Sequence, residues 1–123
     1  MATDNMLLHI DVLMVDGKPV AIEDGTGSLE GAAGFENEIV PSGTGDDFSK
    51  RKRVPRTLAA KIQFGPSVSP GDYKNMNGVQ ITARDSQSGR RVLLNKCSFG
   101  KMGPIGAGSV DITFNVLSEP QWL

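Results

Sequence analysis

The sequence has few of the residues on which much protein chemistry depends. Among its 123 residues there is one cysteine, Cys97, and one histidine, His9. A single thiol forms no disulfide within the chain, so a reducing compartment is the simpler expectation. His9 has no serine, cysteine or metal-ligand partners at a recognisable spacing. Cys97 lies between apolar, strand-like segments, where a small buried cysteine is an ordinary packing residue. No enzyme class is indicated.

Strong net charge and long apolar runs are also absent. Thirteen basic residues against fourteen acidic ones give a formal charge of -1, which argues against a surface that attracts polyanions everywhere. The N-terminal residues 1–17 lack the basic start and apolar stretch of an export signal, and no segment approaches the length of a membrane span. We therefore expect a soluble protein made inside the cell, with no membrane insertion by this chain.

The residues that are present favour a β-rich fold. Glycine is abundant, with 15 residues, and the apolar content of 38% is low, which favours turns and loops over helices. Asp16-Gly17 separates two short apolar arms within residues 12–22, and this dipeptide is a strong hairpin signal. Pro19 cannot donate a ladder hydrogen bond, so the second arm should start after it or lie at a sheet edge.

Strand patterns return in the second half of the chain. Apolar and polar residues alternate in 57–64, 79–84 and 110–116, and each alternation predicts a strand with one buried face. A second hairpin is expected around "DSQSG". The segment "VSPGDYKNMNG" predicts one helix of two or three turns, from Ser69 to Asn77, and the C-terminal "SEPQWL" is expected to dock through Trp122.

Residues 24–55 have neither a helical nor a sustained strand period, and loops this long are usually functional or disordered. Near the end of this segment stand four consecutive basic residues: Lys50, Arg51, Lys52 and Arg53. In an extended chain the lysines point to one side and the arginines to the other, so neither face can enter an apolar core. The run must project from the body.

If the segment folds back at "PSGTG", Glu36 and Glu38 lie roughly opposite the basic run, giving a hairpin arm with an acidic and a basic limb. Such an arm has little core beneath it, so we expect another protein surface to order it. Nucleic-acid binding is the alternative, but the run is short, aromatic residues are scarce around it, and the acidic limb repels phosphate. Asp46 and Asp47, with the two glutamates, do not match the calcium-loop spacing.

The order of these elements resembles the tail tube proteins of tailed bacteriophages, particularly the short tube proteins of Mu-like and other contractile-tailed phages. The resemblance covers nearly the whole chain. It is carried by the hairpin "VLMVDGKPVAIEDGTGS", the long polar loop, the strand "RTLAAKIQF", the "GVQITARDSQSGRRVLLNKCSF" pair and the closing "GSVDITFNV".

The resemblance implies one domain over residues 1–123, a mainly β fold: a β-sandwich or partly closed barrel with one short flanking helix. Six copies would form a ring whose inner sheets join into a central β-barrel, and stacked rings would make the hollow tube that conducts DNA during ejection. Residues 24–55 hold the position of the loop that reaches toward the neighbouring ring. In a closed ring, the open sheet edges of each copy would pair with those of the neighbouring copies. The contacts between one ring and the next do not close on themselves, so rings would stack into a polymer along one axis.

These implications set the expected sites. Inter-subunit and inter-ring contacts are expected from the charged arm: Glu36, Glu38, Asp46, Asp47, Lys50, Arg51, Lys52 and Arg53. We hypothesise that these charges pair with opposite charges on adjacent subunits and choose register more than they supply affinity. The polar faces of two predicted strands are expected to line the channel: Gln80, Thr82, Asp111, Thr113 and Asn115. Arg84 departs from a wholly anionic lumen.

The expected partners are further copies in a hexamer, then tail sheath, baseplate and tape-measure proteins. The expected place is the virion tail, assembled in the bacterial cytoplasm; no cofactor or metal is expected, and DNA would pass without sequence-specific binding. Two alternatives stay open. One is a baseplate-proximal tube homologue or the tube of a contractile injection system, which would form rings without long polymers. The other is a small β-barrel nucleic-acid-binding module that uses residues 50–56.

Overall fold

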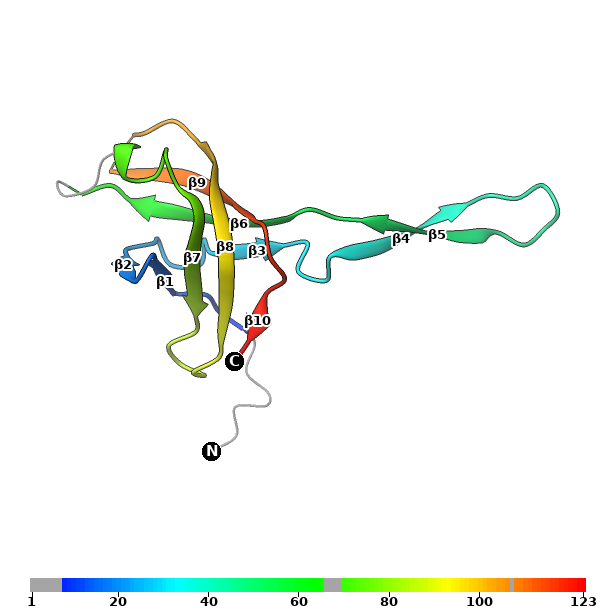
Figure 1. The fold of residues 1–123 in the computed structure, drawn as a ribbon, viewed down its shortest axis with the longest axis horizontal. Helices are drawn as coiled ribbons and strands as arrows, with labels where there is room; N and C mark the ends of the chain where they lie inside the picture. The colour runs from blue at the N-terminus through cyan, green and yellow to red at the C-terminus, as the bar shows by residue number, and fades with distance from the viewer. Residues whose placement is uncertain (1–7, 66–69, 107) are drawn as a thin grey trace.

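The computed structural model describes residues 8–65, 70–106 and 108–123, which are mainly β (Figure 1). Their elements are β1 (Val12–Val15), β2 (Lys18–Val20), β3 (Ser28–Glu30), β4 (Phe35–Val40), β5 (Phe48–Arg53), β6 (Arg56–Gln63), the 3-10 turn η1 (Pro70–Asp72), β7 (Asn77–Arg84), β8 (Arg91–Met102), β9 (Ser109–Val116) and β10 (Gln121–Trp122).

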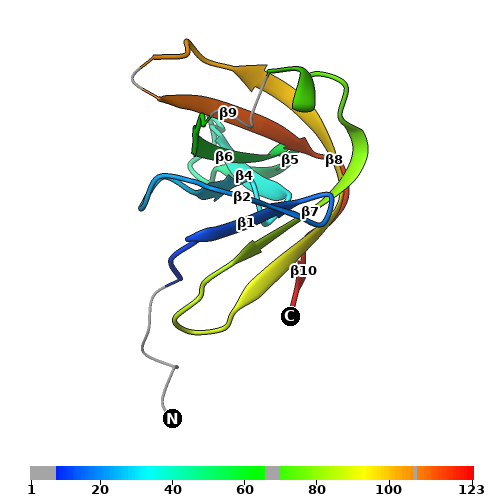
Figure 2. The same ribbon diagram turned by 90° about the vertical axis from the view of Figure 1, so that its left-hand side faces the viewer.

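One curled sheet forms the body of the molecule. Its strand order is β2-β1-β7-β8-β9-β6-β3, with β10 paired to β8, while β4 and β5 make a separate two-stranded sheet. The long strand β8 bends between two partners: its first part pairs with β7 and β10, and its last part pairs with β9. As a result the β1–β7 half folds over the β9–β6 half, as Figure 2 shows. The result is a small β-sandwich-like fold that does not close into a barrel.

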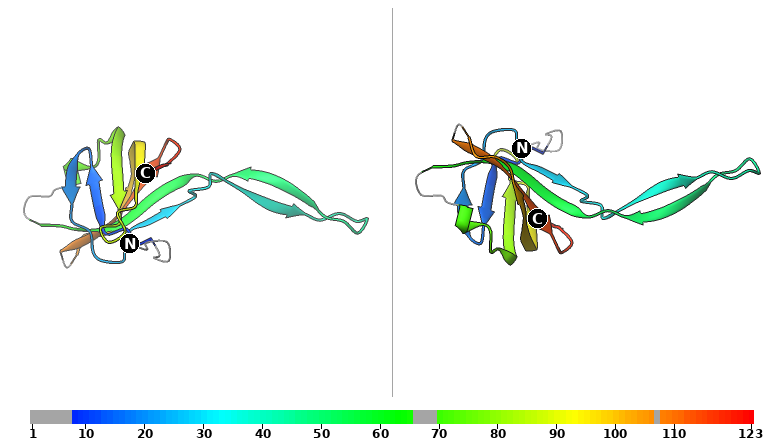
Figure 3. Two further views of the ribbon diagram at one scale, coloured as in Figure 1. Left: turned by 90° about the horizontal axis from the view of Figure 1, so that it is seen from below. Right: turned by 90° about the horizontal axis from the view of Figure 1, so that it is seen from above.

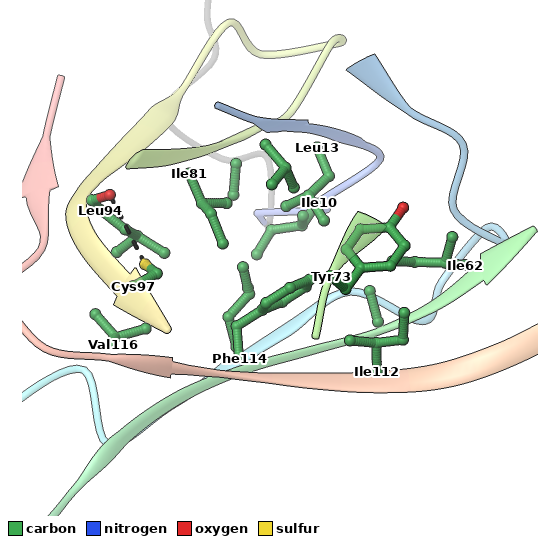
Figure 4. Close-up of a cluster of buried hydrophobic side chains, with 14 of the residues drawn as sticks. Ile10, Leu13, Ile62, Tyr73, Ile81, Leu94, Cys97, Ile112, Phe114 and Val116 are labelled. Carbon is green, nitrogen blue, oxygen red and sulfur yellow. Dashed lines mark hydrogen bonds between the residues drawn. The ribbon is translucent and has the colours of Figure 1, made fainter. Parts of the chain in front are cut away.

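The core lies between these two halves of the sheet (Figure 4). The alternating apolar residues predicted for β6 and β9 point inward, where Leu58, Ile62 and Phe114 have no exposed surface. They face Leu13 and other buried residues of β1, β7 and β8. Each large apolar side chain withdrawn from water in this way contributes about 1.5–3 kcal/mol to folding. The predicted one-faced strands are therefore confirmed.

The first hairpin confirms the prediction made from Asp16-Gly17. Both residues have positive φ, 53° and 78°, as the central pair of a type I′ turn requires. Pro19 lies in β2, which is an end strand of the sheet, so its missing N–H costs no ladder hydrogen bond. The second predicted hairpin, β7–β8, is also present.

The predicted helix from Ser69 to Asn77 is wrong over its described part; Ser69 itself lies outside the described residues. The chain makes only the three-residue turn η1, and β7 begins at Asn77. Burial explains the difference, because Tyr73 packs edge-on against Phe114 with ring centroids 6.1 Å apart. Met76 then accepts a backbone hydrogen bond from Phe99 at 3.1 Å, which holds the chain extended toward β7. Tertiary contacts override the helix-start signal of Pro70.

The C-terminal segment docks as a short strand. Trp122 pairs with Val92 of β8, and its ring lies 5.4 Å from the guanidinium carbon of Arg90. Trp122 remains 46% exposed, so its side chain is not part of the core.

Candidate functional site

The β4–β5 arm is the most prominent feature outside the body. It extends well away from the body in the line of β3 and β6 (Figure 3). All twelve residues of β4 and β5 are exposed, so the arm has no core of its own. An isolated two-stranded ribbon is marginally stable in water. The prediction that residues 24–55 contain a projecting hairpin is confirmed, although the sequence pattern did not indicate β3 within the same segment.

One face of the arm carries a ladder of opposite charges. Glu36 pairs with Lys52, and Glu38 with Lys50, in the antiparallel register, so each glutamate shares a face with the lysine directly across. The predicted opposition of the two limbs is confirmed. No arm charge in the described part of the chain comes within 4 Å of an opposite one. Exposed pairs of this kind contribute at most about 1 kcal/mol each. This face has no net charge.

The opposite face of the arm is cationic and partly apolar. Phe35 pairs across the ladder with Arg53, and Asn37 pairs with Arg51. The guanidinium carbon of Arg51 lies 4.0 Å from the centre of the Phe35 ring, a cation–π contact that keeps both side chains close to the ribbon. Because no acidic residue of β4 shares this face, the charges of Arg51 and Arg53 are not balanced on this face of the arm.

Apolar side chains are exposed along the arm as well. Ile39 is 73% exposed and Phe48 is 65% exposed, and Phe35 and Val40 keep about half of their surface. Val40 and Phe48 lie opposite one another next to the tip. Four exposed apolar side chains close together on a ribbon without a core are unusual for a surface that only contacts water. Apolar surface of this kind is typical of a protein interface. The sequence-based prediction for this segment rested on its charged residues and did not include these four apolar residues.

The tip of the arm, residues 41–47, is organised by its own polar groups. The backbone N–H of Ser42 donates to Asp47 Oδ1 at 3.2 Å, and the hydroxyl oxygens of Ser42 and Thr44 lie 2.7 Å apart. Gly45 has a φ of 106°, which glycine adopts without strain. This arrangement presents the neighbouring carboxylate of Asp46 to solvent at the end of the arm.

The root of the arm is a narrow crossing between body and ribbon. Val54 donates to the carbonyl of Gly34 at 2.9 Å, which holds the two limbs together where they leave the body. Arg56 packs over Gly34, where an added Cβ would lie 2.7 Å from a guanidinium nitrogen. The Nε of Arg56 is buried and has no hydrogen-bond partner in the described structure. Beside it is a hollow of about 410 Å³ lined by Arg53, Val54, Pro55, Arg56, Asn115, Val116 and Leu117.

A second candidate surface is the outer face of β3, β6, β9 and the end of β8. Thr113 and Asn115 line a shallow hollow of about 480 Å³ there, together with Glu30, Thr57, Ala59, Gly100 and Lys101. Asp111 lies on the same face of β9, opposite Lys61. The face is polar and its charges are mixed, since two acidic and two basic residues share it. Because charges of both signs are mixed on it, this face does not create a strong potential of one sign.

The structure does not bring all five predicted channel residues together. Gln80 and Thr82 lie on the outer face of β7, because Ile81 and Ala83 between and beside them are buried. Since the two halves of the sheet turn their buried faces toward one another, the outer face of β7 looks away from that of β9 (Figure 4). Arg84 belongs to the β7 side and does not contribute to the polar face of β9.

His9 and Cys97 have structural surroundings. His9 Nε2 lies 2.8 Å from Asp24 Oδ1, a hydrogen bond that raises the pKa of His9, and its backbone N–H donates to the buried carboxylate of Asp85. Burial raises the pKa of the Cys97 thiol to about 11, so it is unsuited to nucleophilic chemistry. Among the described residues, no three His, Cys, Asp or Glu side chains gather as a metal site requires. No helix in the described ranges is both long and apolar enough to cross a membrane.

Comparison of the sequence with known protein families gives no match, and comparison with curated proteins gives none either. The candidate site is therefore defined by its geometry: an arm with one neutral and one cationic face, an acidic tip, an arginine-lined root and a polar outer face on the sheet.

Proposed function

We propose that this chain is the structural subunit of a bacteriophage tail tube, in which hexameric rings stack into a hollow tube that conducts DNA during ejection. The observation that carries the proposal is the arm. It exposes Phe35, Ile39, Val40 and Phe48 on a ribbon that the body does not cover, so the arm needs a surface that the single copy lacks. A neighbouring copy of the same chain is the simplest source of that surface.

The margins of the sheet support the same proposal. β3 is an end strand, and β8 runs past the start of β7, so that Lys101 and Met102 pair with β9 on one side only. Unpaired strand edges template pairing with another chain. In the proposed ring, the β3 margin of one copy faces the β8 margin of the next. Closure around a symmetry axis then satisfies both edges in every copy and makes the central β-barrel.

The proposed barrel places the polar face of β9 toward the channel. Asp111, Thr113 and Asn115 would line the wall, and Gln80 and Thr82 would lie on the outer surface, toward the tail sheath. A wall with mixed charge lets DNA pass without retaining it. Baseplate and tape-measure proteins are the other expected contacts, at the end and in the lumen of a tube within the virion.

Negative-stain electron microscopy of the purified protein tests the proposal. Long hollow tubes with six-fold end views are the expected result. Isolated hexamers that do not polymerise would favour a baseplate-proximal ring instead. A monomer at high concentration, with the arm ordered by the body alone, would overturn both.

A gel-shift assay at physiological salt separates the remaining alternative. The uncompensated Arg51 and Arg53 are the residues through which the monomer would bind DNA. Binding that is lost in an Arg51→Gln, Arg53→Gln variant, in a protein that forms no ring, would favour a nucleic-acid-binding module.

A further inference from the structure

We propose that the acidic tip of one arm binds the arginine-lined root of the arm on the next copy along the tube. This inference rests on the proposed function, because it requires copies stacked head to tail. The binding surface for the tip is formed by Arg53, Arg56, Asn115 and Leu117 of the next copy.

The arm and the body have similar lengths along the direction of the arm. β6 runs through the body in line with the arm (Figure 1), so its eight residues measure the body along that direction, about 26 Å at about 3.3 Å per residue. The six residues of β4 span about 20 Å by the same rise, and the tip loop, residues 41–47, extends the arm beyond them. A copy displaced along the arm by about one body length therefore has its own root beside the tip of the copy behind it.

The tip and the root of the arm carry opposite charges. The tip carries Asp46 and Asp47 with no basic residue between Pro41 and Ser49, so it is the acidic end of the arm. The root carries Arg53, whose face of the arm holds no acidic residue of β4, and Arg56 beside it. Opposite charges at the two ends of a repeating unit fix the direction and register of a head-to-tail contact.

A buried polar group without a hydrogen-bond partner among the described residues lies at the root of the arm. The Nε of Arg56 is buried without a hydrogen-bond partner in the described structure, although buried polar groups are normally paired. The hollow next to it, about 410 Å³, is large enough for a carboxylate side chain. A carboxylate from outside the chain accepts hydrogen bonds from guanidinium groups in the strong, paired geometry that arginine favours.

Exposed apolar residues match at the same two places. Leu117, at the rim of the root hollow, is 53% exposed, and Phe48 and Val40 stand next to the tip. Contact between them removes apolar surface from water on both copies. The tip loop is already held by the Ser42–Asp47 hydrogen bond, so little ordering is needed on binding.

Cysteine cross-linking of assembled tubes tests the contact. In an Asp46→Cys, Leu117→Cys variant the two thiols lie an arm's length apart within one chain, so a disulfide forms only between copies. Oxidation should give a ladder of covalent multimers that continues past six subunits. The matched control is Glu38→Cys, Leu117→Cys, which places the first thiol in the middle of the arm. This variant should give no ladder, because the middle of the arm does not reach Leu117 of the next copy. Cys97 is buried and should form no cross-link in the unmodified chain.

A charge exchange is the second test. Asp46→Arg or Arg53→Asp alone should raise the critical concentration for polymerisation about tenfold, and the double variant should restore it. The control exchange Glu36→Lys, Lys52→Glu keeps the cross-strand pair and should polymerise normally. Normal tubes without the Asp46–Leu117 cross-link would overturn this contact and leave the tube intact. An unmodified chain that never polymerises would overturn the tube and the contact together.

Discussion

At the scale of single residues, Cys97 shows how the interior sets chemistry. The residue has no exposed surface, and its thiol donates only a weak hydrogen bond to the carbonyl of Leu94, with the sulfur 3.8 Å from the oxygen (Figure 4). Burial disfavours the thiolate, which is why the pKa rises to about 11 from an ordinary value of 9.0. The unfolded chain therefore loses the Cys97 proton at a lower pH than the folded chain.

This difference predicts a pH-dependent stability. The contribution of Cys97 is complete below pH 9 and is lost as the pH rises from 9 toward 11. Between pH 8 and pH 10 the free energy of unfolding should fall by about 1 kcal/mol on this account. Urea denaturation of the protein and of Cys97→Ala at both pH values measures it. Tyr73, whose pKa is raised by burial, titrates in both proteins, so the extra slope should vanish in the variant. Equal slopes would contradict the prediction.

At the scale of elements, the close pairing of β8 with β9 requires a glycine at position 100. The register between β8 and β9 shifts between Phe99 and Lys101, which marks a bulge. A Cβ at Gly100 would lie 2.6 Å from the carbonyl oxygen of Thr113 and 3.2 Å from Asn115 Oδ1. The close approach of the two backbones needs a residue without a side chain.

Gly100→Ala should therefore destabilise the body by about 1–3 kcal/mol. Gly65→Ala is the matched control, because a Cβ there meets nothing within 4 Å and the φ of Gly65 is not positive. Urea denaturation of the two variants should show a loss for Gly100→Ala alone. Equal stability of Gly100→Ala and the unmodified protein would mean that β9 can move away at no cost.

The elements also show what sequence patterns can predict. β6, β7 and β9 were predictable because each buries one face, which fixes the period of two. The opposition of β4 and β5 was predictable from charge alone, since Glu36 and Glu38 match the lysines across a single turn. β3 is three residues long, which is too short to show an alternating pattern in the sequence. The helix predicted from Pro70 does not form because Tyr73 is buried against strands that are distant in the sequence, and no local pattern reports that burial.

The candidate site was predictable only in part. Its charged residues follow from composition, but the division of the arm into a neutral and a cationic face follows from the register. Arg56 was missed for a similar reason, because its orphaned Nε depends on how the limbs cross at Gly34. No local sequence signal reports such a crossing.

At the scale of the whole molecule, the arm and the body are separable. The hydrogen bond from Val54 to Gly34 brings the two ends of the arm together, so residues 35–53 can be replaced by a two-glycine link with little distortion. The body keeps its whole core, because no residue of β4 or β5 is buried.

The armless variant should fold with a thermal midpoint close to that of the full chain and fail to form tubes. Circular dichroism during heating and size-exclusion chromatography with electron microscopy measure the two properties. A control with Ser42→Gly and Thr44→Gly, which makes residues 42–45 all glycine, keeps both limbs and should retain rings. Long tubes from the armless variant would contradict the proposed role of the arm in assembly.

The junction of β5 and β6 has a mechanical consequence. Only Val54 and Pro55 separate the two strands, so a pull on the arm is passed straight into β6 without a slack loop to absorb it. β6 is paired with β9 at eight consecutive positions. A force along β6 must therefore break the hydrogen bonds of all eight pairs at the same time. A fibre built from such units would resist stretching with the stiffness of its sheets.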